Sequence, residues 1–286
     1  MMYTAPTTVD EVCQLLASSA AAKVFAGATD LLPQAQAGRP LEEVLVDLKR
    51  IPRLMSLEVD DREWTIGAAT PAARLAEHPQ LRSDYPGLVE AVALIGSDQI
   101  QSRASLGGNL CNASPAADSG PSMVVNEARA VIASTAGLRS IPIDDLVRGP
   151  GETSLGPDEV VVEFQLDRPA GRRADAYLRF TPRTEMDIAV VGAAARVAVD
   201  DEGRCTDAAV VLGAVAPTTV RVDGIADELV GSSFDEETLR RCAVLSSEAC
   251  RPIDDMRGTK EFRRHIAGVL TMRVIRLAAE RAGEQR

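Results

Sequence analysis

Residues 105–118 carry the densest group of positions in this chain that suit binding of an anion. They read Ser-Leu-Gly-Gly-Asn-Leu-Cys-Asn-Ala-Ser-Pro-Ala-Ala-Asp. Gly107 and Gly108 have no side chain to hold the main chain away from a bulky anion, and glycine adopts positive φ freely. Asp118 could accept hydrogen bonds from ribose hydroxyls or adenine amines. Further neutral polar groups stand at Asn109, Asn112 and Ser114. The stretch predicts a cradle for a dinucleotide.

A second stretch of similar character lies near the N-terminus, over residues 24–33. It runs from apolar Val-Phe through Ala-Gly-Ala-Thr-Asp into Leu-Leu-Pro. This order indicates a strand, a loop of small residues and the start of a helix. Thr29 or Asp30 could cap that helix, whose first backbone amides would then face an anion. Two cradles predict an extended ligand.

Each stretch taken singly has a simpler explanation. A Gly-Gly pair beside asparagine is often a tight turn, and residues 26–30 alone fit a helix-capping turn without ligand. Two common nucleotide motifs are missing from the sequence, the Gly-x-x-x-x-Gly-Lys-Ser/Thr phosphate loop and the Gly-x-Gly-x-x-Gly fingerprint. Their absence disfavours a simple kinase or ATPase and a Rossmann dinucleotide site.

Composition places the chain among ordinary globular proteins. It has 286 residues, 45% hydrophobic and 26% charged, with a formal net charge of -11. That charge argues against nucleic acid or an anionic membrane as partner, since both need clustered positive potential. An anionic ligand must therefore be held by local backbone amides and not by the overall charge of the protein. No apolar run approaches the roughly 20 residues that span a bilayer, and no signal peptide is evident, so a cytoplasmic location is expected.

Cysteine and histidine placement argues against a metal site in this chain. The five cysteines are widely spaced and form no Cys-x-x-Cys pair. We expect reduced thiols and no iron–sulfur cluster, because cluster ligation needs four gathered thiolates. His78 and His265 stand apart from any zinc-like spacing and are expected at the surface.

Hydrophobic periodicity predicts mixed helices and strands. Residues 7–19 show helical spacing, and 24–25 end a strand. Further strands are expected over 41–48, 63–68, 130–133 and 159–166, and helices over 71–78, 87–96 and 122–128. Arg-Pro-Ala-Gly at 168–171 marks a plausible boundary. Beyond it, β-rich segments at 177–180, 188–199 and 208–214 precede helices at 235–249 and 259–282, which predicts an α+β layer.

The C-terminal residues 256–286 are basic, with eight Lys or Arg against three Glu. A solvated helix face explains this charge, and docking against an acidic sister subunit is the alternative.

The chain resembles a known family, the flavin-binding medium subunit of molybdenum hydroxylases. This family includes bacterial carbon monoxide dehydrogenase and the flavin domain of xanthine dehydrogenase. The resemblance rests on four motifs and on the overall length. They are Ala-Gly-Ala-Thr-Asp-Leu at 26–31, Arg-Ala-Ser-Leu-Gly-Gly-Asn-Leu at 103–110, Ala-Ser-Pro-Ala-Ala-Asp at 113–118, and Tyr-Leu-Arg-Phe-Thr-Pro-Arg-Thr-Glu-Met-Asp-Ile-Ala at 177–189. It covers nearly the whole chain.

The resemblance implies an α+β fold in two parts. The first is a two-part FAD-binding domain of the vanillyl-alcohol-oxidase-like type over residues 1–170, with α/β subdomains of about 1–57 and 58–170. The second, over 171–286, is a smaller C-terminal domain with a three-stranded antiparallel sheet and helices.

The resemblance also implies which residues line FAD. One side of the pyrophosphate would be lined by Ala26, Gly27, Ala28, Thr29, Asp30 and Leu31. The other would be lined by Ala104, Ser105, Gly107, Gly108, Asn109 and Asn112. Around the remainder of FAD, Asp118 would contact the adenosine portion, Val160 and Val161 would lie on the strand that meets the flavin region, and Ile188 would lie near the isoalloxazine ring.

Some of these positions depart from the family pattern or have structural alternatives. Ala28 replaces a frequent second glycine, and its methyl group matters if φ there is positive. Ile95 stands where eukaryotic relatives place an aromatic ring against adenine, so its contact would be apolar packing only. Arg179 occupies a place often held by lysine and could simply form an ion pair. Val160, Val161 and Ile188 fit a core strand equally well.

The implied activity is electron transfer without a catalytic residue in this chain. A large subunit with molybdenum cofactor would oxidise substrate, a small subunit with two [2Fe-2S] clusters would pass electrons on, and FAD here would deliver them to an external acceptor. A dimer of such heterotrimers is expected. The alternatives are a free-standing FAD-dependent NAD(P)H oxidoreductase and a non-redox scaffold subunit.

Overall fold

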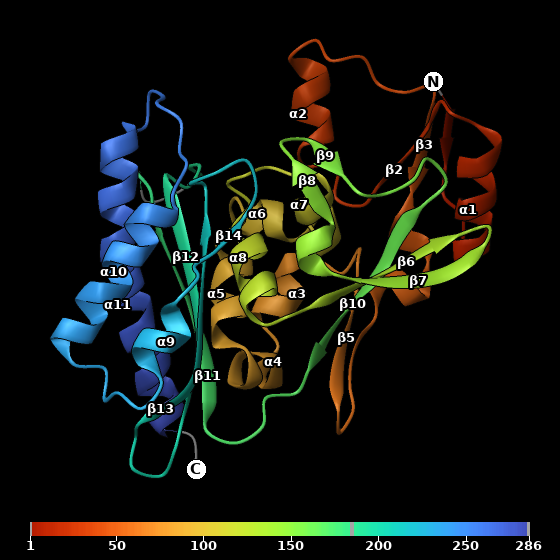
Figure 1. Cartoon of the computed structure of the whole chain (residues 1–286). Helices are drawn as coiled ribbons and strands as arrows, with labels where there is room; N and C mark the ends of the chain where they lie inside the picture. Colours follow the sequence, from red (N-terminus) through yellow and green to blue (C-terminus); the bar gives the residue numbers. More distant parts are fainter. Residues whose placement is uncertain (1, 184–185, 285–286) are drawn as a thin grey trace. The chain divides into compact units, whose positions relative to one another are not determined.

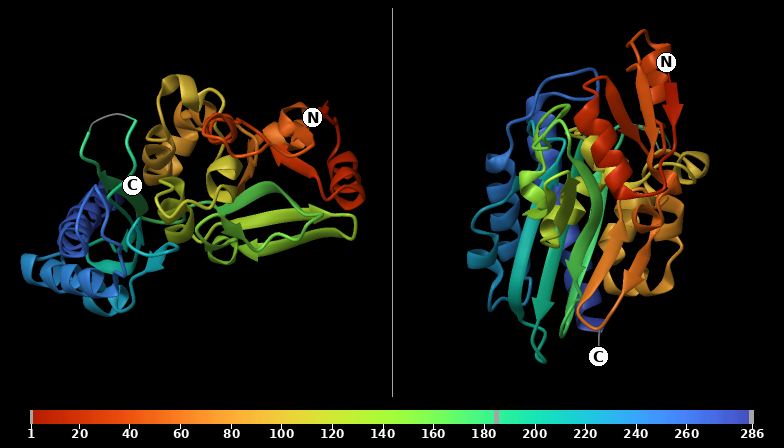
Figure 2. Two further views of the ribbon diagram at one scale, coloured as in Figure 1. Left: turned by 90° about the horizontal axis from the view of Figure 1, so that it is seen from above. Right: turned by 90° about the vertical axis from the view of Figure 1, so that its right-hand side faces the viewer.

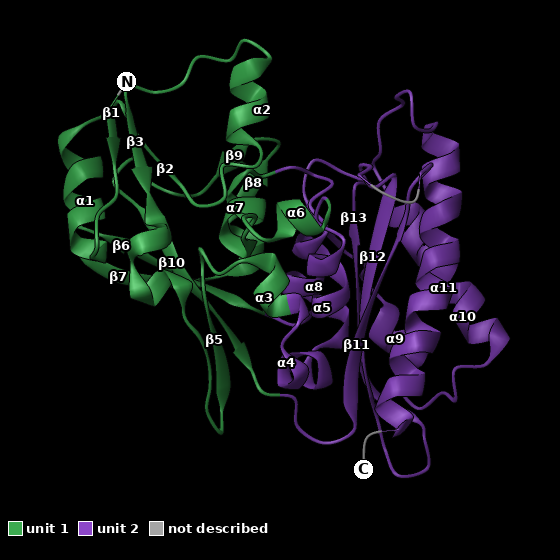
Figure 3. Cartoon of the chain, turned by 180° about the vertical axis from the view of Figure 1, so that it is seen from behind, with its two compact units in different colours: residues 1–75, 97–113, 128–168 green, residues 76–96, 114–127, 169–286 purple. Residues whose placement is uncertain are grey.

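A computed structural model describes residues 2–183 and 186–284 (Figure 1). The chain forms two compact units, each assembled from separate stretches of sequence (Figure 3). Unit 1 comprises residues 1–75, 97–113 and 128–168, and unit 2 comprises 76–96, 114–127 and 169–286. The contiguous domains 1–170 and 171–286 stay a prediction.

Unit 1 begins with a small parallel sheet. Its strands β1 (Met2–Thr4), β3 (Val44–Asp47) and β2 (Ala22–Phe25) lie in the order β1-β3-β2. Helix α1 (Val9–Ser18) joins β1 to β2, as the spacing over 7–19 predicts, and the Thr8 hydroxyl accepts from the Glu11 amide to cap it. Its buried face packs into a core shared with β3 and the larger sheet of the same unit.

That larger sheet is antiparallel, in the order β4-β5-β10-β6-β7. Its strands are β4 (Leu57–Val59), β5 (Glu63–Gly67), β10 (Val160–Asp167), β6 (Arg129–Ser134) and β7 (Gly137–Pro142). β10 lies at the centre and is almost wholly buried, which suits its run of β-branched residues. The shorter elements of unit 1 are α2 (Leu31–Gln36), η1 (Leu48–Arg50), η2 (Pro52–Met55), α3 (Ala72–Ala76), α6 (Asp98–Gln101), α7 (Leu106–Cys111), η3 (Ile143–Asp145), β8 (Val147–Gly149) and β9 (Glu152–Thr153).

Unit 2 is a sheet with helices on both faces (Figures 1 and 2). The antiparallel strands are β11 (Arg173–Phe180), β12 (Val191–Val199), β13 (Cys205–Gly213) and β14 (Val220–Arg221). On one face lie α9 (Ile225–Leu229), α10 (Glu236–Ala249) and α11 (Lys260–Glu284), and on the other lie α4 (Pro79–Asp84), α5 (Pro86–Ala93) and α8 (Ser119–Val125). Coverage on both faces explains why β12 is a nearly continuous run of small apolar residues.

The α+β architecture predicted from the sequence is confirmed. The three long C-terminal strands are present, and the two-residue β14 extends their sheet. Several boundaries differ from prediction; the strand expected over 177–180 begins at Arg173, and the helix expected over 71–78 spans only Ala72–Ala76. The strand expected from residue 188 begins at Val191, and the helix expected over 122–128 spans Ser119–Val125, because Glu127 takes a left-handed φ of 57° that a helix does not allow.

The basic C-terminal segment, residues 256–286, forms several ion pairs with acidic residues of unit 2. Arg276 pairs with Glu236, and Arg281 pairs with Glu90. Arg263 is 4% exposed and pairs with Asp255 at 2.8 Å. Along the ranges that the structure describes, no helix has both the length and the apolar character needed to cross a bilayer.

Candidate functional site

The first predicted loop follows β2 and leads into α2. Ala28 has φ of 59°, so its backbone is left-handed, the conformation in which its methyl group is costly. Asp30 is the N-cap residue of α2, but its side chain makes no capping hydrogen bond. Its φ of -100° and ψ of -37° are helical, whereas a capping side chain requires an extended backbone. The expected cap by Asp30 is therefore wrong.

The second predicted loop forms the start of α7. The Ser105 hydroxyl accepts from the Gly108 amide at 3.2 Å and caps this helix. The Gly107 amide donates to the Ala68 carbonyl at 3.0 Å, and a Cβ added to Gly107 would lie 2.5 Å from that carbonyl oxygen. Glycine at 107 is thus required by contact with the protein's own backbone. At Gly108 an added Cβ would meet only the Ser105 hydroxyl, at 3.2 Å.

The two loops lie against each other within unit 1. A Cβ on Gly27 would come within 2.5 Å of the Arg103 carbonyl oxygen and 3.0 Å of the Ala104 Cα. Farther along, the Gln34 side-chain amide approaches the Asn112 amide oxygen at 3.5 Å. Because Gly27 has no side chain, backbone meets backbone at this point. The structure therefore brings together the two stretches that the sequence singles out.

A lysine that belongs to none of the predicted motifs lies beside the second loop. The Lys49 ammonium donates to the Ala69 carbonyl at 3.0 Å, one residue from the carbonyl that holds Gly107. Burial, and then the nearby Arg103, lower the pKa of Lys49 to about 8. The signal available in the sequence was a Lys-Arg pair at 49–50, one residue after the strand at 44–47. This lysine adds local positive charge to an acidic protein.

Unit 2 contains a buried polar cluster around Asp118. One carboxylate oxygen accepts from the Tyr177 hydroxyl at 2.8 Å, and the other accepts from the Arg179 guanidinium at 2.7 Å. Arg179 also donates to the Leu94 carbonyl at 3.1 Å. The Arg179 and Asp118 side chains are only 8% and 9% exposed. Burial raises the pKa of Asp118 to about 6, although Arg179 and Tyr177 act in the opposite direction.

The ion-pair alternative for Arg179 is thus what the structure contains, and Asp118 is its partner. Tyr177 belongs to the same cluster and was not among the predicted residues. Its hydroxyl would lie 2.6 Å from a Cβ added to Gly192, so glycine in β12 makes room for it. Ile95, expected to give apolar packing, is buried at 9% exposure in the same unit.

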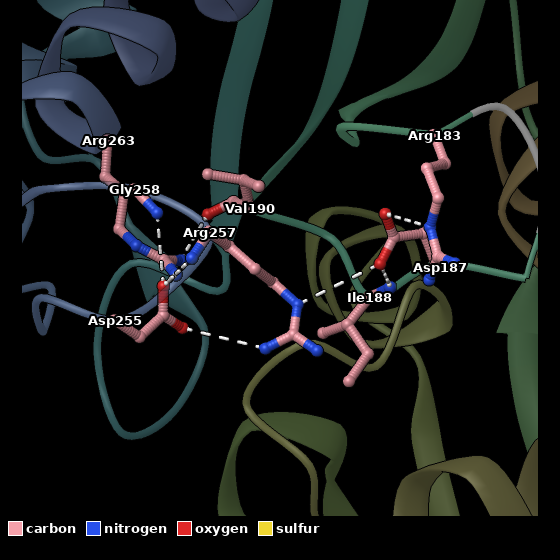
Figure 4. Close-up of polar contacts among 8 residues, drawn as sticks. All are labelled: Arg183, Asp187, Ile188, Val190, Asp255, Arg257, Gly258 and Arg263. Atoms are coloured by element: carbon pink, nitrogen blue, oxygen red, sulfur yellow. Dashed lines mark hydrogen bonds and ion pairs between the residues drawn. The ribbon is translucent and has the colours of Figure 1, made fainter.

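The remaining predicted residues differ in exposure. Val160 and Val161 are each 3% exposed in β10, and Val160 belongs to the core of unit 1. Ile188 is 51% exposed and precedes β12, so its core-strand alternative is wrong. Its amide donates to the Asp187 carboxylate at 2.9 Å (Figure 4). Thr184 and Glu185 of the same motif lie outside the described residues.

Comparison with known proteins identifies both halves of the chain. Residues 1–168 match the family described as FAD binding domain in molybdopterin dehydrogenase, and residues 176–278 match the CO dehydrogenase flavoprotein C-terminal domain. A putative xanthine dehydrogenase FAD-binding subunit of Escherichia coli K12 is 30% identical, over 98% of this chain and 97% of that protein. The carbon monoxide dehydrogenase medium chain of Hydrogenophaga pseudoflava is 30% identical, over 96% of each.

Solved structures agree with the sequence relatives. One is carbon monoxide dehydrogenase from Hydrogenophaga pseudoflava lacking the Mo-pyranopterin moiety, with a TM-score of 0.93, 29% identity and 98% coverage of both chains. Another is quinoline 2-oxidoreductase from Pseudomonas putida 86, with a TM-score of 0.92, 31% identity, and coverage of 99% of this chain and 98% of that one. These matches confirm the family predicted from the four sequence motifs and the length of the chain.

Proposed function

Since the chain belongs to the family of FAD-binding domains in molybdopterin dehydrogenase, we propose that it is the flavoprotein subunit of a molybdenum-containing oxidoreductase. In this role it binds FAD, accepts electrons from [2Fe-2S] clusters of a partner subunit and passes them to an external acceptor. The observation that carries the proposal is the direct packing of the Gly27 loop on Arg103 and Ala104. This contact joins the two stretches that the family uses for one dinucleotide.

The residues of unit 1 fit the diphosphate part of FAD. With a net charge of -11, the protein must hold an anion by local groups. Both loops consist largely of small residues, Gly108 is open beyond the Ser105 hydroxyl, and the Lys49 ammonium lies beside them. The positions proposed to line the cofactor are Ala26, Gly27, Ala28, Thr29, Asp30, Leu31, Ala104, Ser105, Gly107, Gly108, Asn109, Asn112, Val160 and Val161.

In unit 2 the proposed cofactor residues are Ile95, Asp118, Arg179 and Ile188. Asp118 is oriented by Tyr177 and Arg179, so its carboxylate is held in one position for a contact with the adenosine portion. Ile95 offers apolar packing, and the exposed Ile188 offers an apolar surface to the flavin ring. FAD supplies the redox chemistry when bound. The guanidinium of Arg179 favours negative charge in its surroundings by Coulomb attraction.

The proposed partners are a large molybdenum-cofactor subunit and a small [2Fe-2S] subunit, arranged as a dimer of heterotrimers. Support comes from the relatives, several of which are named as medium chains or FAD subunits of dehydrogenases. The substrate binds to another chain in this scheme, so residues of the present chain orient the flavin and limit its access to solvent.

The first test is the identity of the bound cofactor. The purified protein should show flavin absorbance and release FAD, not FMN, on denaturation, and molybdenum and iron should co-purify with the native complex. A colourless protein from cells supplied with riboflavin would support the scaffold alternative. NADH oxidation by the isolated chain would support the free-standing oxidoreductase.

A further inference from the structure

Two arginines of unit 2, Arg257 and Arg263, contact the two ends of the stretch Asp187–Val190 (Figure 4). Arg263 donates to the Val190 carbonyl at 2.6 Å and to the Ala214 carbonyl at 3.1 Å. Arg257 places its Nε 3.9 Å from a carboxylate oxygen of Asp187. The same Asp187 oxygen accepts from the Ile188 amide at 2.9 Å. Both ends of a four-residue stretch are therefore tied to the segment that precedes and begins α11.

The two arginines share one carboxylate, that of Asp255. Arg263 Nη2 lies 2.8 Å from Asp255 Oδ1, and Arg257 Nη1 lies 3.9 Å from Asp255 Oδ2. Asp255 Oδ1 also accepts from the amides of Arg257 and Gly258, at 2.8 and 3.2 Å. Asp255 thus orients the backbone that carries Arg257 as well as both guanidinium groups.

Burial makes this network more than a chance surface pairing. The side chains of Arg263 and Asp187 are 4% and 6% exposed, and within the same stretch Val190 is fully buried. Asp255 and Arg257 are 27% and 30% exposed. Neighbouring charges alternate in sign along Asp187, Arg257, Asp255 and Arg263. Asp187 also pairs with Arg183, whose Nε lies 3.4 Å from its other carboxylate oxygen. Ile188 follows Asp187 directly and is 51% exposed.

We propose that Asp255 is a positioning residue for Ile188. Through Arg257 and Arg263 it fixes the backbone of Asp187–Val190, and thereby holds the Ile188 side chain in place as a cover for the flavin ring. The inference rests on the proposed function, because that function assigns Ile188 to the ring. Its consequence is that a residue about seventy positions farther along the chain sets how far solvent reaches the flavin.

The test compares Asp255→Asn with Asp254→Asn in the full chain with FAD bound. Asp254 is a matched control because it is adjacent, 57% exposed, and bonded to Lys260 instead, whose amide donates to it at 2.7 Å. Hydrogen exchange of the Ile188 and Val190 amides reports the order of the stretch. Quenching of flavin fluorescence by iodide reports solvent access to the ring.

Asp255→Asn should speed exchange of these amides, and raise the iodide quenching constant, each about two- to fivefold, the size expected when a partly exposed ion pair is lost. Asp254→Asn should leave both unchanged. Unchanged exchange in Asp255→Asn, or equal changes in the two variants, would overturn the positioning role. Faster exchange with unchanged quenching would overturn the link between Ile188 and the ring.

A second variant guards against misfolding. Arg257→Gln removes a partner that is 30% exposed, so the fold should tolerate it, and it should change exchange and quenching in the same direction. Hydrogen exchange does not need the cofactor. If the unaltered protein yields no FAD on denaturation, the proposed function fails by itself, and the exchange data still decide whether Asp255 orders Asp187–Val190.

Discussion

The two loops of unit 1 and the Asp118 cluster of unit 2 are built in opposite ways. The loops come together because side chains are missing, and Gly27 and Gly107 each meet a backbone carbonyl at a distance that excludes a Cβ. The cluster comes together because charged side chains satisfy one another, with Arg179 and Asp118 almost fully buried. The comparison predicts that the loops are sensitive to added volume, whereas the cluster is sensitive to lost charge.

The largest effect is expected from Arg179→Gln. It leaves the Asp118 carboxylate buried without its cation, a change that costs about 3–5 kcal/mol of unfolding free energy. Urea unfolding at pH 7 measures it. Arg240→Gln is the control, because this arginine is 69% exposed in its pair with Glu236 and should cost less than about 1 kcal/mol. Equal losses in the two variants would show that burial does not strengthen the Asp118 pair.

The same substitution has a second readout if FAD binds as proposed. Removing a nearby cation disfavours the anionic reduced forms of the flavin, so Arg179→Gln should lower the flavin midpoint potential. Spectroelectrochemical titration measures the midpoint. An unchanged value would place Arg179 outside the electrostatic reach of the flavin ring.

The pH dependence of stability isolates Asp118. Its pKa is raised from 3.8 to about 6, so the folded chain binds this proton more tightly than the unfolded chain. The associated stability is fully present below pH 3.8 and is lost as the pH rises through 6. Asp118→Asn has no titrating group at this position. The difference in unfolding free energy between the unaltered protein and the variant should therefore change by about 3 kcal/mol between pH 3.8 and pH 6. Parallel stability profiles from urea unfolding at several pH values would contradict the assignment.

In the loops, volume should matter more than charge. Gly27→Ala forces a methyl group against the Arg103 carbonyl and should cost about 1–3 kcal/mol, with loss of bound FAD. Gly108→Ala is the matched control for stability only, since this glycine is also proposed to line FAD; it lies inside α7 near only the Ser105 hydroxyl, and the variant should change stability by no more than about 1 kcal/mol. Thermal unfolding and FAD content after purification measure both. A Gly27→Ala protein with normal FAD content would argue against close loop contact.

The smallest expected effect is an increase in the free energy of unfolding. Ala28 holds a left-handed φ of 59°, so Ala28→Gly relieves strain and should stabilise unit 1 by about 0.5–1 kcal/mol. The same exchange at Ala73 in helix α3 should instead cost about 1 kcal/mol. Urea midpoints compare the two. Destabilisation by Ala28→Gly would mean that its methyl group makes contacts worth more than the strain.

Sequence patterns predicted most of the elements and the two loops, because the local signals there are strong. Helix α1 follows from apolar spacing, whereas the Gly-Gly-Asn stretch, expected as a loop, lies inside helix α7. The patterns gave no role to Lys49, which belongs to no motif, or to Tyr177, which opens the 177–189 motif, because each acquires its role from partners 20 and 59 positions away. They also assigned Gly107 to ligand approach, whereas its neighbour is the Ala68 carbonyl.

Residue order alone was enough to predict the family and the α+β class, because these depend on residue types at short spacing; the anion-binding character of the loops stays a prediction. Folding was needed to pair Asp118 with Arg179, to bring Gly27 against Arg103 and to set the network from Asp187 to Arg263. Such contacts join residues that are distant in the chain. Their energies arise from burial and close packing, which have no counterpart in a linear pattern.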